Sequence, residues 1–208
     1  MAKITVLKEG KGRNKRINVF LDGRFAFSLE ADVLVAERLR VGQELVASDI
    51  EKLTRADEHQ RAMNTASRLL GYRPRSEAEI REKLLRRGFA AETIDAVMVK
   101  LKEQKLVDDT AFARFWKENR DSFRPRSRRM TQLELRRKGV DSEVIAEVIS
   151  GIDDSQNAYR AALPKVRQLK TVDYETFRRR LGEYLRRRGF DYGVANKTVE
   201  KMWREKES

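Results

Sequence analysis

One seventeen-residue frame occurs twice in the chain, and this repetition restricts the possible folds more than any other feature. RPRSEAEIREKLLRRGF occupies residues 73–89, and RPRSRRMTQLELRRKGV occupies residues 124–140. Each copy holds an Arg-Pro-Arg-Ser element, a segment with helical spacing, a basic cluster, a glycine and an apolar residue. A supersecondary unit that cannot bury its apolar face alone does so by stacking on its copies, so the sequence predicts tandem stacked units.

The register extends beyond the frame and reaches a third copy. The shift of 51 residues that aligns the two frames also aligns Asp57-Glu58 with Asp108-Asp109. A further shift of 50 finds LRRRGF at residues 185–190, preceded by the acidic pair Asp153-Asp154. The third copy lacks the RPRS element and carries extra residues near Pro164, so its surface is expected to differ from the other two.

Start and stop signals divide each copy into three helices. The acidic pairs are expected to cap the first helix, because negative side chains stabilise the unpaired N–H groups there. Proline ends that helix in copies one and two, and Ser76 with Glu79 forms a capping box for the second helix. The shared glycine then ends the second helix in a left-handed conformation, after basic residues that favour the helix C-terminus.

The first 55 residues follow a different pattern, with apolar residues at every second position in three short runs. Asp22-Gly23 lies between two of these runs, which is typical of a type I′ hairpin turn. A short helix is expected around Val33 and Leu39, closed by Val41-Gly42. A long helix is expected to begin at Ser48, which stands three residues before Glu51 at capping-box spacing.

The predicted fold is therefore mainly α: three tandem three-helix repeats forming an elongated curved solenoid, preceded by a small β-hairpin or three-strand domain. An apolar fraction of 40% is thin for one compact core, which favours the elongated arrangement. The expected boundaries are residues 1–55, 56–107, 108–152 and 153–208. The β domain is expected either to offer a sheet edge to a partner or to cover the first repeat.

Composition favours a polyanionic partner and gives little support for catalysis. The chain has 46 Lys and Arg against 33 Asp and Glu, a net charge of +13, which attracts nucleic acid or acidic protein. It has no cysteine and a single histidine, His59, and it lacks a phosphate-binding glycine loop. The prediction is a protein that is not an enzyme and has no metal or cofactor. The N-terminus lacks a secretory signal and no segment is apolar enough to span a membrane, so a cytoplasmic location is expected.

The repeated basic clusters are the candidate binding residues. Each cluster alone is explained equally well as a solvated helix end, and each RPRS element as a plain connection between helices. If the repeats stack in one orientation, however, equivalent cations fall along one side and form a basic stripe for phosphates or an acidic groove. The candidates are Arg73, Arg75, Arg86, Arg87, Arg124, Arg126, Arg128, Arg129, Arg136, Arg137, Lys138, Arg178, Arg179, Arg180, Arg186, Arg187 and Arg188. Phe112, Phe115 and Trp116 are predicted to form a buried stripe instead of a base-stacking surface.

These strings resemble the RecX family of bacterial recombinase regulators. The resemblance is strongest over residues 62–140, in SRLLGYRPRSEAEIREKLLRRGF and in the Leu-Val-Asp-Asp that precedes the second repeat. It implies a non-enzymatic regulator that binds the RecA recombinase and its filament on single-stranded DNA, and mostly inhibits it, in homologous recombination, DNA repair and the SOS response. Family members are also implied to contact DNA themselves.

Three functions remain open at this stage. The leading one is the recombinase regulator, acting as a monomer that caps, severs or competes within the filament. The alternative is a stand-alone basic nucleic-acid-binding protein, which would bind DNA or RNA tightly without the recombinase. A plain scaffold whose charges only solubilise it would bind neither partner.

Overall fold

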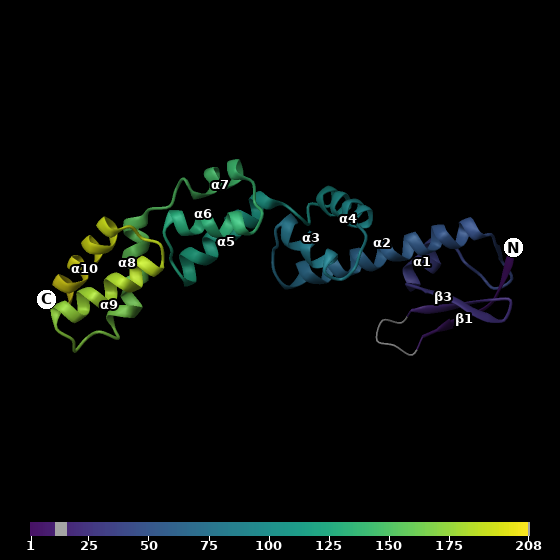
Figure 1. Ribbon diagram of the computed structural model, residues 1–208, viewed down its shortest axis with the longest axis horizontal. Helices are drawn as coiled ribbons and strands as arrows, with labels where there is room; N and C mark the ends of the chain where they lie inside the picture. Colours follow the sequence, from purple (N-terminus) through teal and green to yellow (C-terminus); the bar gives the residue numbers. More distant parts are fainter. Residues whose placement is uncertain (11–15, 208) are drawn as a thin grey trace. The chain divides into compact units, whose positions relative to one another are not determined.

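The computed structural model describes residues 1–10 and 16–207. Within these residues the chain forms two compact units, one made of residues 1–73 with 80–106, and the other of residues 74–79 with the chain from Val107 onward. We call them unit 1 and unit 2. The predicted combination of a small β domain and three repeats of three helices is confirmed (Figure 1).

Unit 1 begins with an antiparallel sheet of order β3-β2-β1-β4. The strands are β1 (Ala2–Glu9), β2 (Ile17–Leu21), β3 (Arg24–Leu29) and β4 (Glu44–Leu45). Asp22 and Gly23 have φ values of 46° and 80°, the positive pair that a type I′ turn requires, so the hairpin prediction is confirmed. The prediction of three strands missed β4, whose two residues are too few to show a period of two.

Two helices close the sheet. The short α1 (Ala31–Ala36) ends before Leu39, and the long α2 (Ala47–Tyr72) follows β4. Ile4, Val19 and Leu53 belong to the core that these elements enclose. The predicted capping box at Ser48 is wrong: the helix begins at Ala47, and the N–H of Val46 donates to Asp49 Oδ2 over 2.9 Å.

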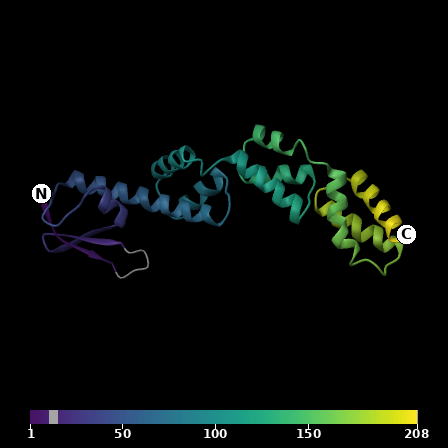
Figure 2. The same ribbon diagram turned by 180° about the vertical axis from the view of Figure 1, so that it is seen from behind.

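The remainder of unit 1 belongs to the first repeat, which shares α2 with the sheet and whose residues 74–79 are part of unit 2. α1 and the strands lie along the first half of α2, and α3 (Glu77–Leu85) and α4 (Ala91–Glu103) lie along its second half (Figure 1). The same arrangement is seen from behind in Figure 2. α2 ends one residue before Arg73-Pro74, as the proline predicted.

Unit 2 contains the second and third repeats. The second repeat consists of α5 (Asp109–Phe123), α6 (Arg128–Arg137) and α7 (Ser142–Ile149), and the third of α8 (Asp154–Val166), α9 (Tyr174–Arg187) and α10 (Tyr192–Glu207). Asp108 and Asp153 cap α5 and α8 through their carboxylates, and α5 stops just before Arg124-Pro125. Pro164 is accommodated inside α8.

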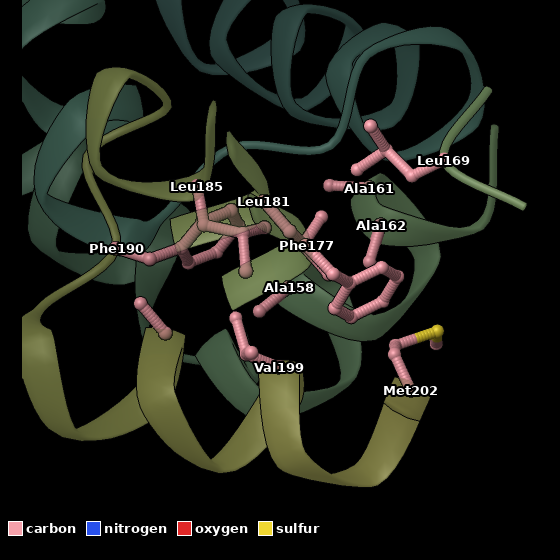
Figure 3. Packing of buried hydrophobic residues seen from close by; sticks show 11 residues of the cluster. Ala158, Ala161, Ala162, Leu169, Phe177, Leu181, Leu185, Phe190, Val199 and Met202 are labelled. Carbon is pink, nitrogen blue, oxygen red and sulfur yellow. The ribbon is translucent and has the colours of Figure 1, made fainter. Parts of the chain in front are cut away.

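Each repeat of unit 2 has its own apolar core. In the third repeat, Phe177, Leu181 and Leu185 of α9 point between α8 and α10 toward Ala158 and Val199 (Figure 3). In the second repeat, Phe112 is 1% exposed and Trp116 packs partly buried against the same core. The predicted buried stripe is therefore confirmed for Phe112 and Trp116, whereas Phe115 is half-buried and is not part of this core.

Candidate nucleic-acid and protein interface

The repeated frame has a structural role that is visible in unit 2, where the loop of one repeat contacts the turn of the next. The Ser76 hydroxyl donates to the carbonyl of Lys138 over 2.6 Å. One repeat further on, the Ser127 N–H donates to the carbonyl of Arg188 over 3.2 Å. Each RPRS serine therefore contacts the basic-glycine turn of the repeat that follows.

The shared glycines allow this close approach. Gly88, Gly139 and Gly189 all have positive φ, between 74° and 91°, as predicted. A Cβ on Gly139 would overlap the Cβ of Ala78, and one on Gly189 would lie 2.6 Å from Ser127 Oγ. Among the described residues, a Cβ on Gly88 would meet nothing within 4 Å. Glycine therefore allows the positive φ of this turn in all three repeats, and in the second and third repeats it also allows close packing.

The acidic pairs also join the repeats, a role that sequence reasoning missed. Asp108 and Asp153 cap their own helices, but the second acid of each pair reaches the preceding repeat. Asp109 Oδ1 accepts from the N–H of Glu77 over 2.8 Å, and Asp154 Oδ1 accepts from the N–H of Arg128 over 2.6 Å. The only available signal was that each pair has two acids where one cap suffices.

Several predicted binding residues of unit 2 are occupied inside the protein. Arg126 pairs with Glu134 at 3.0 Å, and Glu134 also accepts from Arg120 and from the indole N–H of Trp116. Lys138 pairs with Glu79. These ion pairs hold Arg126 and Lys138 in place at the contact between repeats. The two residues are therefore poor candidates for a partner-binding surface.

Two further cations at the contact between repeats bind backbone carbonyls. The guanidinium of Arg128 donates to the carbonyls of Ser150 and Ile152, over 3.1 and 2.7 Å. Arg188 donates to the carbonyl of Pro125 over 3.2 Å and stacks over the ring of Tyr184. A side chain that satisfies the last carbonyls of neighbouring helices acts as a structural cap.

The other candidates lie at the surface or in the RPRS loops. Arg73 and Arg75 are half-buried. Arg86 pairs with Glu82, Arg178 lies 4.0 Å from Glu175, and Arg187 lies 3.8 Å from Glu183. Pairs of this kind, exposed and on one helix, restrain a cation weakly. Eight candidates are exposed and have no ion partner among the described residues: Arg87, Arg124, Arg129, Arg136, Arg137, Arg179, Arg180 and Arg186.

The third repeat arranges part of this set around a groove between α9 and α10, which we call the α9 groove. Its volume is about 200 Å³. Arg178, Arg179 and Arg186 line it from α9, and Tyr192 and Asn196 line it from α10. Gly182 lies between the arginines, where a larger side chain would fill the groove. Three guanidinium groups beside an exposed aromatic ring are the chemistry that a nucleic-acid backbone and base require.

The second repeat carries two of these arginines at equivalent positions. Arg129 and Arg136 of α6 correspond to Arg179 and Arg186 of α9 at the repeat shift of 50. Residues seven apart in a helix lie on one face, so each pair forms one basic face. The first repeat has Ala78 and Leu85 at the same positions, which confines this feature to unit 2.

The described residues place no group of metal ligands beside these arginines. Within residues 1–10 and 16–207, no three His, Cys, Asp or Glu side chains are grouped so that they could hold a metal ion. His59 lies in α2, where burial and the charge of Lys100 lower its pKa below the ordinary value of 6.5. Across the same residues, no helix has the length and apolar composition of a membrane span.

Fold and surface together define a class of protein: a small β domain followed by tandem three-helix repeats whose exposed functional groups are chiefly cationic. Family models place the chain within this class. Residues 2–46 match the regulatory protein RecX N-terminal domain, residues 62–101 the first RecX three-helix domain, and residues 108–149 the second. The chain belongs to the RecX family of regulatory proteins.

Curated relatives and solved structures agree with this assignment. The chain is 31% identical over 203 residues to regulatory protein RecX of Bacillus velezensis, covering 96% of this chain and 77% of the relative. It is 27% identical to that of Clostridium perfringens strain 13, covering 97% of both chains. A crystal structure of regulatory protein RecX superposes with a TM-score of 0.67 at 25% identity, over 96% of this chain and all of the other. The structure of RecX from Lactobacillus salivarius, at 19% identity and a TM-score of 0.59, supports the fold alone.

Proposed function

We propose that this chain is a non-enzymatic regulator that binds the RecA recombinase filament on single-stranded DNA and mostly inhibits the recombinase in recombination and DNA repair. The observation that carries the proposal is the equivalent pair of unpartnered arginines on α6 and α9. Membership in a family of regulatory proteins supports the regulatory role.

The proposal follows from the fact that these arginines can bind a new anion without first breaking an internal ion pair. A guanidinium group that is already paired inside the protein gives up that pair when it binds a new anion, and the exposed ones give up only water. Four arginines are exposed in this way and recur at the repeat spacing: Arg129, Arg136, Arg179 and Arg186. A filament presents its protein and phosphate groups periodically, so a periodic ligand can engage more than one of them at once.

The test compares two charge-reversal pairs with a matched control. The test variants are Arg129→Glu with Arg136→Glu, and Arg179→Glu with Arg186→Glu. The control is Arg167→Glu with Lys170→Glu, two exposed cations of the third repeat that lie outside the α9 groove. All three variants change the net charge by the same amount, so a difference between them reports position and not total charge.

Binding is measured by co-sedimentation with recombinase filaments formed on single-stranded DNA, and function by recombinase ATP hydrolysis and strand exchange. Each test pair is expected to weaken filament binding about tenfold, the loss expected when two phosphate contacts are removed near physiological salt. Helicity is expected to stay unchanged. If the parent chain has no effect on the recombinase at several-fold excess over the filament, the regulatory proposal is wrong.

The alternative function is that of a stand-alone nucleic-acid-binding protein, which the net charge of +13 favours. It predicts tight binding to naked DNA at the ionic strength at which filaments are bound. Weak binding to naked DNA beside strong binding to the filament favours the regulator.

A further inference from the structure

Unit 1 contains a second group of arginines, around a hollow that runs along α2. We call it the α2 hollow, and its volume is about 560 Å³. Its main lining residues are Arg61, Asn64, Thr65 and Arg68 of α2 with Arg87 and Phe89 from the turn after α3. The four α2 residues share one helix face, because their spacing is that of successive helical turns.

Ion pairs within the protein leave the arginines of the hollow largely free to bind an anion. Arg68 and Arg87 are exposed, and neither has an ion partner within the described residues. Arg61 lies 4.0 Å from Asp57, at the outer limit of an ion pair. Asp57 is already occupied, since it accepts from Arg16 over 2.8 Å and from the N–H of Glu30 over 2.7 Å.

The one carboxylate that lines the hollow does not cancel this charge. Glu30 pairs with Arg16 at 3.2 Å. Glu58 lies on the same helix as the arginines, but its carboxylate accepts a hydrogen bond from the N–H of Ala90 over 3.0 Å. The hollow therefore keeps a positive excess that acidic neighbours do not neutralise.

The Thr65 hydroxyl lies among these arginines and has no partner inside the protein. Thr65 is 6% exposed, and its hydroxyl makes no hydrogen bond to any described residue. The fully buried side-chain atom that lacks a hydrogen bond in the described residues is Arg126 Nε, so the Thr65 oxygen is accessible at the surface of the hollow. Thr54 and Thr198, by contrast, each donate over 2.8 Å to the carbonyl four residues earlier. An accessible hydroxyl without an internal partner can donate to a ligand in the hollow.

Guanidinium groups, a hydroxyl and the amide of Asn64 are donors suited to phosphate oxygens. Arg61 and Arg68 are seven residues apart, which spans about 10 Å along the helix and favours a run of backbone over a single anion. A protein partner needs an aromatic or aliphatic anchor. The only apolar lining residue, Phe89, is 8% exposed and offers none.

We propose that the α2 hollow is a phosphate-binding subsite for single-stranded nucleic acid, separate from the arginines of unit 2. Arg61, Arg68 and Arg87 bind the phosphodiester backbone, and the Thr65 hydroxyl donates to a phosphate oxygen at the floor of the hollow. The ligand is a single strand, because its backbone can bend into a concave surface and a stiff duplex resists such bending. The subsite acts without the recombinase, so it stands or falls independently of the proposed function.

The experiment measures binding of the full chain to a fluorescein-labelled oligothymidylate by anisotropy over a range of salt concentrations. Arg68→Ala with Arg87→Ala is expected to weaken binding and to reduce the slope of log affinity against log salt by about 1.4, or 0.7 for each lost phosphate contact. Thr65→Val, which has nearly the same shape, is expected to weaken binding about tenfold without changing the slope.

The matched control is Lys52→Ala with Arg55→Ala, two exposed cations of α2 that do not line the hollow. Circular dichroism verifies the fold of every variant. Thr65→Val is expected to retain full thermal stability, because the hydroxyl it removes has no partner in the unbound protein.

Three other outcomes overturn the proposal. Hollow variants that bind the oligonucleotide as the parent does, or lose no more than the control, exclude the subsite. Loss confined to duplex DNA excludes a single-strand ligand. Normal oligonucleotide binding with loss of filament binding assigns the hollow to a protein partner, whereas failure of the unit 2 variants alone leaves the hollow intact and contradicts only the proposed function.

Discussion

At the scale of single residues, Glu134 organises the charges of the second repeat. One oxygen accepts from Trp116 over 2.8 Å and from Arg120 over 2.7 Å, and the other forms an ion pair with Arg126 at 3.0 Å. The Glu134 side chain is only 14% exposed. A carboxylate with several donors in a partly buried setting is costly to remove, because its partners are left charged and unpaired.

Glu134→Ala is therefore expected to lower the free energy of unfolding by about 2–3 kcal/mol, less than a fully buried pair because the arginines keep some contact with water. Glu147→Ala is the control, since Glu147 pairs with Arg114 at 2.8 Å and both side chains are more than 60% exposed. That change is expected to cost about 0.5 kcal/mol or less. Urea denaturation measures both, and equal losses would contradict the organising role of Glu134.

His59 predicts a pH dependence of stability. Its pKa in the folded protein lies below 6.5, first because of burial and then because of Lys100. The unfolded chain therefore takes up a proton at higher pH than the folded chain does, and stability is lost as pH falls below about 6.5 toward the folded value. His59→Gln is expected to remove this part of the pH profile, and Lys100→Gln to reduce it. Denaturation between pH 7.5 and pH 5 measures the effect, which is absent if the three profiles are parallel.

At the scale of helices and loops, the joint between repeats is one recurring arrangement. The RPRS loop receives the basic-glycine turn of the next repeat, and the second acid of the next repeat caps the helix that the loop begins. In the sequence, the RPRS element, the basic cluster, the glycine and the acidic pair look like separate signals for helix starts and ends. In the structure all four belong to one contact between repeats. The joint also explains why the side chains of Arg128, Lys138 and Arg188 are held by contacts within the protein.

The glycine of the joint provides a direct test of packing. Gly88→Ala is expected to cost about 1–2 kcal/mol, the cost of positive φ for a residue with a Cβ. Gly139→Ala is expected to cost more, because its Cβ also overlaps Ala78. Combining Gly139→Ala with Ala78→Gly is expected to recover about 1 kcal/mol or more of coupling energy in a double-mutant cycle. Additive effects measured by urea denaturation would show that the contact does not limit the packing.

At the scale of the whole molecule, the net charge of +13 is contributed by both units, and the available arginines are divided between them. Arg68 and Arg87 belong to unit 1, and Arg129, Arg136, Arg179 and Arg186 belong to unit 2. The salt dependence of binding counts phosphate contacts whichever unit provides them.

Combining Arg68→Ala and Arg87→Ala with Arg179→Ala and Arg186→Ala is accordingly expected to reduce the salt slope for single-stranded DNA by about 2.8, twice the change for either pair. Anisotropy titrations on one oligonucleotide long enough to reach both sites measure the three slopes. A combined variant whose slope equals that of one pair would mean that only one unit contacts the strand.

The sequence by itself determined the elements of this protein, because their signals are local. Proline, glycine and capping residues act within a few positions of the chain, so the I′ hairpin, the three-helix repeats and the helix ends before Arg73 and Arg124 were all predicted. The start of α2 was misplaced because Ser48 and Asp49 both suit the first turn of a helix. The two residues of β4 were missed because they are held by pairing with β1, 41 or more positions earlier in the chain.

Only the tertiary structure decided which cations are available. Seventeen basic residues look alike in sequence, since arginine carries the same charge wherever it stands. The partners that occupy Arg126, Lys138 and Arg188 come from other segments of the chain, up to 63 residues away. The α2 hollow was missed for the same reason: Arg61 and Arg68 lie on α2 and Arg87 lies in the turn after α3, so the three come together only once the chain is folded. Electrostatic and hydrogen-bond pairing depends on distance in space, which a linear pattern does not contain.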